Sequence, residues 1–131
     1  MYEDEKKKIK DFTDLKVWQE GHLLVIKIYK ITKNFPKDET FGLTSQMRRA
    51  AVSITSNIAE GFGRQTYKDK AHFYYQSQGS LTELKDQIII AKDIGYLSDT
   101  DFNELMDKAN FTHQILQGLI TKTKTFINPK L

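Results

Sequence analysis

The stretch from Arg64 to His72 is where residue types and spacing come closest to reaction chemistry. Asp69 precedes His72 by three positions, and a carboxylate at this spacing can share a metal ion with a histidine on one helix face. A di-metal site in a helical bundle needs two such pairs and two further glutamates. The other histidines, His22 and His113, stand alone, and the chain has no cysteine. We therefore expect no metal, no cofactor and no catalytic residues.

Other kinds of catalytic site are matched no better. No serine or threonine stands on the strained strand-to-helix turn that activates a nucleophile. The glycines at 61 and 63 lack the Gly-Lys-Ser/Thr ending of a phosphate-binding loop. Helical ribonucleases pair an arginine with a histidine at a shorter spacing than the seven residues between Arg64 and His72. Ribonuclease activity is thus the enzymatic alternative, and we expect a protein that is not an enzyme.

Basic residues are concentrated in one part of the chain. All three arginines fall within 17 residues, two lysines follow closely, and residues 43–72 contain only two acids, Glu60 and Asp69. The tail adds Lys122, Lys124 and Lys130, with no acid after Asp107. Clustered cations attract nucleic-acid phosphates, whereas scattered, solvated charges are the alternative explanation. The predicted nucleic-acid-binding residues are Arg48, Arg49, Arg64, Lys68 and Lys70.

A second group of polar residues predicts a hydrogen-bonded contact between two helices. Asn57 and Glu60 lie one turn apart on a helix whose other residues there are apolar or small. Buried polar groups must find partners, so we expect a network that ties this helix to the next one. The predicted members are Asn57, Glu60, Ser80 and Glu83. The alternative is a polar pocket completed by Arg48, Arg49 or Arg64.

Length and composition indicate one domain. The chain has 131 residues and a net charge of +3, with a pI of about 9.0 and a mean hydropathy of −0.54. The charged first residues carry no apolar run typical of a secretory signal, and the apolar stretch 23–31 is too short to span a membrane. We expect a cytoplasmic protein without a membrane partner, with a disordered polar arm over residues 1–10 and one domain over residues 11–127.

Apolar residues recur every three or four positions and predict four helices. The expected helices run from about residue 14 to 34, from 43 to 59, from 66 to 94, and from 98 to about 124. Pro36, Gly61 and Gly95 mark three of the ends. Short connections between the later helices favour antiparallel neighbours. The predicted fold is all-α, an up-down-up-down antiparallel four-helix bundle.

The first helix carries two apolar stripes, more than a simple two-layer contact needs. One stripe is Leu15, Trp18, His22, Val25 and Tyr29. The other is Leu24, Ile28, Ile31 and Phe35, which we expect to cover another helix or another subunit. In the third helix, Gly79 suggests a close crossing or a kink. Exposed aromatic residues there would stack bases or fill a subunit interface, and the interface is favoured.

Three segments resemble a known family. They are residues 35–54, the run Asn57-Ile58-Ala59-Glu60-Gly61, and the run Gly79-Ser80-Leu81-Thr82-Glu83-Leu84. They resemble the bacterial four-helix-bundle proteins encoded in intervening sequences of 23S ribosomal RNA genes, and the resemblance spans about Phe12 to Lys122. Residues 75–78 and Asp86 depart from the family's usual pattern on the third helix.

The resemblance implies a bundle that assembles into a ring-like homopentamer. The family includes accessory variability proteins of diversity-generating retroelements, which bind nucleic acid and a reverse transcriptase. For most members no enzyme activity is established. The leading hypothesis is a non-enzymatic homopentamer that binds structured RNA or another nucleic acid. The expected partners are further copies of itself, and either RNA or a nucleic-acid-processing protein. The alternative is a protein-interaction scaffold or accessory subunit with no nucleic-acid role.

Overall fold

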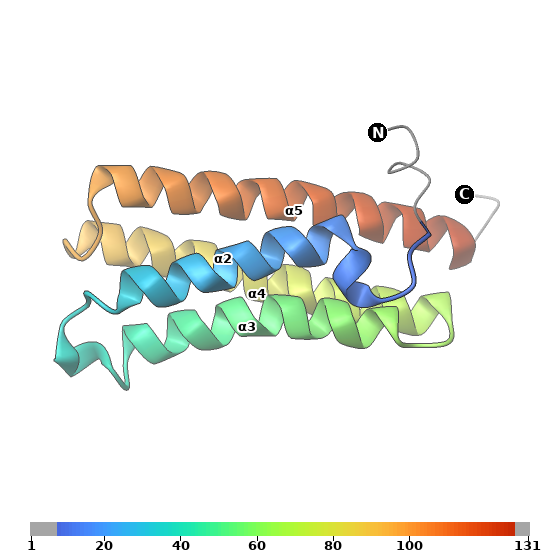
Figure 1. The fold of residues 1–131 in the computed structure, drawn as a ribbon, viewed down its shortest axis with the longest axis horizontal. Helices are drawn as coiled ribbons and strands as arrows, with labels where there is room; N and C mark the ends of the chain where they lie inside the picture. The colour runs from blue at the N-terminus through green and yellow to red at the C-terminus, as the bar shows by residue number, and fades with distance from the viewer. Residues whose placement is uncertain (1–7, 128–131) are drawn as a thin grey trace.

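The computed structural model describes residues 8–127, and Figure 1 shows four long helices lying side by side. The helices are α2 (Lys16–Thr32), α3 (Leu43–Phe62), α4 (Tyr67–Asp93) and α5 (Asp99–Ile127). Two short 3-10 helices, η1 (Phe12–Asp14) and η2 (Lys37–Glu39), precede α2 and α3. Residues 1–7 of the predicted disordered arm lie outside the described residues. Lys10 belongs to the ordered part, because its amide donates to Asp14 Oδ2 (3.0 Å).

Successive helices run in opposite directions, which confirms the up-down-up-down bundle (Figure 1). Each helix packs against two neighbours: α2 and α4 both contact α3 and α5. Within the described chain, no helix is both long and apolar enough to cross a membrane.

The core lies along the bundle axis and draws on all four helices. Of the two stripes on α2, the second one enters this core: Leu24 and Ile28 are fully buried, and Phe35 nearly so. It therefore packs inside its own chain, and it is His22 and Tyr29 of the first stripe that remain exposed. Periodicity revealed two apolar faces but did not tell which one points inward. The largest fully buried side chains are Leu24, Ile28, Met47, Ile54, Ile58, Leu81, Leu84, Ile88, Leu105, Leu116 and Ile120.

α3 and α4 approach each other closely at Gly61. A Cβ atom at Gly61 would lie 2.7 Å from Tyr74 Cε1, whereas one at Gly79 would meet nothing within 4 Å. The close crossing expected at Gly79 was therefore wrong, and Gly61 marks the tight contact instead. α3 continues through Gly61 to Phe62, so this glycine lies inside the helix and not just past its end.

Local signals set the other helix boundaries. Thr66 accepts a hydrogen bond from the Asp69 amide (3.1 Å) and caps α4, as its sequence position predicted. Gly95 has φ of +91°, and the amide of Tyr96 donates to the Ala91 carbonyl (2.8 Å). This is a Schellman ending, in which a left-handed glycine satisfies the last carbonyls of a helix.

Candidate nucleic-acid interface

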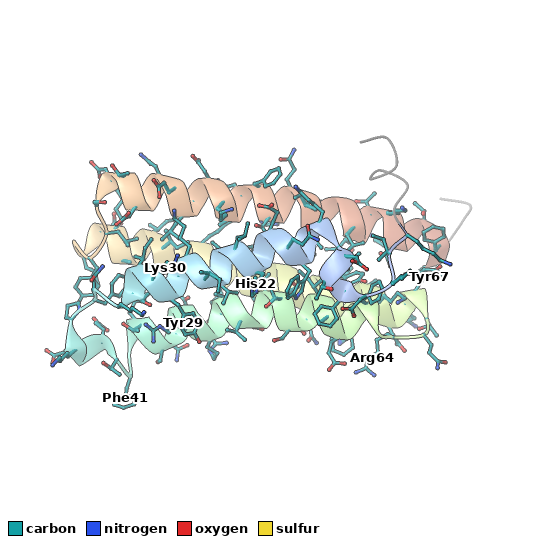
Figure 2. All side chains as sticks on the ribbon, in the orientation of Figure 1. His22, Tyr29, Lys30, Phe41, Arg64 and Tyr67 are labelled. Atoms are coloured by element: carbon teal, nitrogen blue, oxygen red, sulfur yellow. The ribbon has the colours of Figure 1, made fainter. Side chains whose placement is uncertain are left out.

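The five predicted nucleic-acid-binding residues do not form one cluster. Arg48 and Arg49 lie near the start of α3, and Arg64, Lys68 and Lys70 lie beyond its end. At 1.5 Å of rise per residue, the 16 positions between Arg48 and Arg64 span about 24 Å. Figure 2 shows the same separation, with Tyr29 and Lys30 toward one end of the bundle and Arg64 toward the other.

Arg48 and Arg49 hold helices together. Arg48 Nε donates to Thr32 Oγ1 (2.9 Å), and its guanidinium lies 4.6 Å from the centre of the Tyr29 ring. Arg49 forms an ion pair with Glu83 of α4. Because these contacts join α3 to α2 and to α4, both arginines have a structural role at this end of the bundle.

Lys70 and Arg64 also have partners within the chain. Lys70 Nζ donates to the carbonyl of Phe62 (2.5 Å), so it caps the C-terminus of α3, where carbonyls lack helical partners. Burial lowers the pKa of Lys70. Arg64 pairs with Glu60 (3.1 Å) and lies 4.5 Å from the Phe73 ring centre. Lys68 is exposed and makes no ion pair with any described residue.

The bundle topology brings further cations close to Arg64, Lys68 and Lys70. The N-terminal segment, the α3–α4 turn and the last turns of α5 meet at one end of the molecule (Figure 1). We call the described residues 8–16, 60–70 and 119–127 the basic end. It has eight cations against four acids. The cations are Lys8, Lys10, Lys16, Arg64, Lys68, Lys70, Lys122 and Lys124.

The opposite end is different. The described segments 30–48 and 90–104 hold five cations and six acids. The positive charge of the bundle is therefore concentrated at one end. The acid-free tail after Asp107 was a sequence signal for this feature. Only the antiparallel course of α5 places that tail beside Lys68.

The predicted polar network has different members. Asn57 Nδ2 donates to Ser53 Oγ (3.1 Å) and to the Ser53 carbonyl (2.9 Å), and Ser53 Oγ bonds Ser80 Oγ of α4 (2.8 Å). Glu60 is not part of it, because it points to the surface and pairs with Arg64. Glu83 lies outside as well, in its ion pair with Arg49. Ser53 was the missed residue, and its position one turn before Asn57 was the available signal.

A family model named 23S rRNA-intervening sequence protein matches residues 13–118 of this chain, which is most of the bundle. The chain belongs to the 23S rRNA-intervening sequence protein family. None of the curated proteins compared matches it.

A solved relative has the same fold as this intervening-sequence protein. It is the crystal structure of a protein of unknown function from the S23 ribosomal protein family of Bacteroides thetaiotaomicron. The two share 18% identity with a TM-score of 0.72, and the likeness covers 79% of this chain and 97% of the other. At this identity the likeness shows the fold alone.

Arg64 and His72 are the two residues of the ribonuclease alternative in this intervening-sequence protein. Arg64 and His72 both contact Phe73, and the His72 ring bonds Gln76 (2.9 Å). The described residues contain no group of three or more histidines and acids that could hold a metal ion.

A lysine–histidine pair crosses the seam between α4 and α5. Lys85 Nζ lies 2.7 Å from His113 Nδ1, and the ammonium donates to the neutral ring. Burial, and then the charge of Lys85, lower the pKa of His113 below its ordinary 6.5, and burial lowers the pKa of Lys85. The folded protein therefore resists protonation of His113, because burial disfavours the charged ring and because protonation would place two positive charges side by side.

This pair predicts a loss of stability in acid. A histidine with a lowered folded-state pKa stabilises the fold above its unfolded pKa of about 6.5 and loses that contribution as the pH falls. In urea unfolding at pH 7.5 and 5.5, His113→Gln should show a smaller drop in free energy than the unmodified protein. The exposed His72→Gln is the matched control and should retain the full drop. Equal drops in all three proteins would contradict the assignment.

Proposed function

We propose that this intervening-sequence protein is a non-enzymatic, cytoplasmic homo-oligomer that binds RNA through its basic end. The observation that carries the proposal is the convergence of three chain segments with eight cations and four acids. The family description names an intervening sequence of 23S rRNA, and this is the reason to choose RNA as the ligand. The absence of cysteine suits a reducing cytosol.

Lys68 and Lys122 are the cations best placed to contact phosphates. Both are exposed, and neither has an ion-pair partner among the described residues. A lysine that neutralises a phosphate releases a condensed counterion, which is a favourable term that weakens as salt rises. Several copies of the basic end in one ring would add avidity without any new contact.

The outer surface of α2 supports the oligomeric part of the proposal. Leu23, Ile26 and Tyr29 are exposed there, and Val52 of α3 is exposed as well. We call these four residues the α2 face. Apolar side chains clustered on a surface mark interaction sites more often than single ones do. We propose that the α2 face joins subunits, with five subunits as the number implied by the family resemblance.

Reversing charge at the basic end should weaken RNA binding. We expect Lys68→Glu/Lys122→Glu to raise the Kd for a labelled structured RNA by roughly tenfold or more. The plot of log Kd against log salt concentration should also become flatter, because each phosphate contact contributes about 0.9 to its slope. The measurement is fluorescence anisotropy across a salt series.

The matched control carries the same charge change at the opposite end. Lys33→Glu/Lys37→Glu replaces two exposed lysines there and should change the Kd much less. Equal weakening by both variants would show attraction to the net charge rather than to the basic end. A protein that binds no RNA even at low salt would support the alternative of a protein-interaction scaffold, for which the exposed α2 face is the favouring observation.

A further inference from the structure

Besides its surface charges, the basic end contains a hollow of about 380 Å³. Residues from the N-terminal segment, the end of α3, the start of α4 and the last turns of α5 line it. Most of the lining is apolar, with Ile9 and Phe62 among its residues, and two lysines, Lys70 and Lys122, contribute to it. It therefore combines a hydrophobic wall with positive charge.

Two aromatic rings stack at this hollow and are half exposed. The Tyr67 and Phe126 ring centres are 4.8 Å apart at an interplanar angle of 25°. Tyr67 is 46% exposed and Phe126 is 50% exposed. The rings come from the first turn of α4 and the last turns of α5, and Figure 2 shows Tyr67 at the end of the bundle. Large aromatic surfaces left in water gain free energy when a flat apolar group covers them.

The two lysines of the hollow would attract a negative charge attached to such a flat apolar group. Lys70 Nζ has three protons and donates to the carbonyls of Phe62 and Gly61 (2.5 and 3.5 Å), and Lys122 is exposed. Tyr74, which is buried, forms part of the same lining. A ligand that fits has a planar π face and anionic groups close to it.

We infer that the hollow binds an unpaired nucleobase of RNA, stacked on Tyr67 and Phe126, with its neighbouring phosphates at Lys70 and Lys122. This inference rests on the proposed function and names its ligand more narrowly. In a duplex the bases are stacked on one another, whereas loops, bulges and single strands offer free base faces to aromatic side chains. The protein therefore recognises unpaired segments of an RNA in preference to its helices.

The test compares three labelled RNAs of equal length: a single strand without secondary structure, a duplex, and a single strand whose central nucleotides are abasic. The unmodified protein should bind the base-containing strand most tightly. Tyr67→Leu/Phe126→Leu keeps apolar side chains and removes both rings, and it should lose about tenfold in affinity for that strand. Its affinity for the abasic strand, which has the same phosphates, should not change.

The matched control is Tyr75→Leu/Phe111→Leu. These two aromatic residues are about equally exposed, 44% and 45%, and neither lines the hollow. This variant should retain the full preference for the base-containing strand. A second measurement needs no variant: 2-aminopurine placed in the single strand should lose fluorescence when the unmodified protein binds, because stacking quenches it.

The outcomes separate the two proposals. If no RNA binds, the proposed function fails. If RNA binds but duplex, abasic and base-containing strands bind alike, with no effect of the leucine variant, then the inference fails and the basic end remains a phosphate-binding surface. Loss of binding to all three RNAs in the leucine variant, with its helical signal intact, would also overturn the inference.

Discussion

Gly61→Ala should lower the free energy of unfolding by about 1–3 kcal/mol, although alanine is normally the better helix residue. The added Cβ would lie 2.7 Å from Tyr74 Cε1 and 3.1 Å from Phe73 Cβ. The Tyr74 ring packs in the core, and burial raises its pKa to about 12. The strain therefore falls on the α3–α4 contact.

The same substitution at Gly79 should have the opposite sign. Nothing lies within 4 Å of a Cβ at Gly79, and the residue itself is exposed on α4. Gly79→Ala should therefore stabilise the protein by about 0.5–1 kcal/mol. Urea unfolding of both variants measures the difference. If both stabilise the protein, Gly61 is not the close-packing position, and its place in the Asn-Ile-Ala-Glu-Gly motif needs another physical reason.

Ile26→Glu should break the proposed assembly into single chains. Ile26 lies near the centre of the α2 face between Leu23 and Tyr29, and a buried glutamate without a partner would be strongly unfavourable at a subunit interface. Light scattering after gel filtration should give about 76 kDa for the unmodified protein, five times the 15.2 kDa of one chain. The variant should give a mass near 15.2 kDa.

Ile90→Glu is the matched control for this experiment. Ile90 of α4 is 41% exposed, the same as Ile26, but it lies outside the α2 face. Its assembly mass should not change. If both variants kept the mass of five chains, the subunit interface would have to lie on another face of the bundle. A monomeric unmodified protein would remove self-assembly and the avidity argument, and the basic end would then have to bind RNA as a single copy.

RNA binding and assembly are assigned to two different surfaces of the bundle. The α2 face lies on the side of the bundle, and the basic end lies at one tip (Figures 1 and 2). Ile26→Glu should therefore weaken RNA binding only through lost avidity, without changing the preference for unpaired bases. Lys68→Glu/Lys122→Glu should leave the assembly mass unchanged, because neither lysine belongs to the α2 face.

The sequence by itself determined the four helices and most of their ends. These signals act over a few residues: Thr66 caps α4 through the Asp69 amide, Ser98 accepts from the Asp101 amide (3.1 Å), and Gly95 adopts the left-handed conformation that ends α4. Short connections then fix antiparallel neighbours. Such local hydrogen bonds and backbone preferences can be read from spacing alone, so the fold class was predictable.

Only the tertiary structure decided which residues meet. Arg48 and Arg64 are close in sequence, but the length of α3 that separates them holds them about 24 Å apart. Lys68 and Lys122 are far apart in sequence, but antiparallel packing of α4 and α5 brings their segments to one end. The same packing buried Leu24 and Ile28, left Tyr67 and Phe126 exposed, and made Gly61 rather than Gly79 the tight position. Helix periodicity shows how many faces a helix has, whereas its neighbours determine which face is buried and which is left for a ligand.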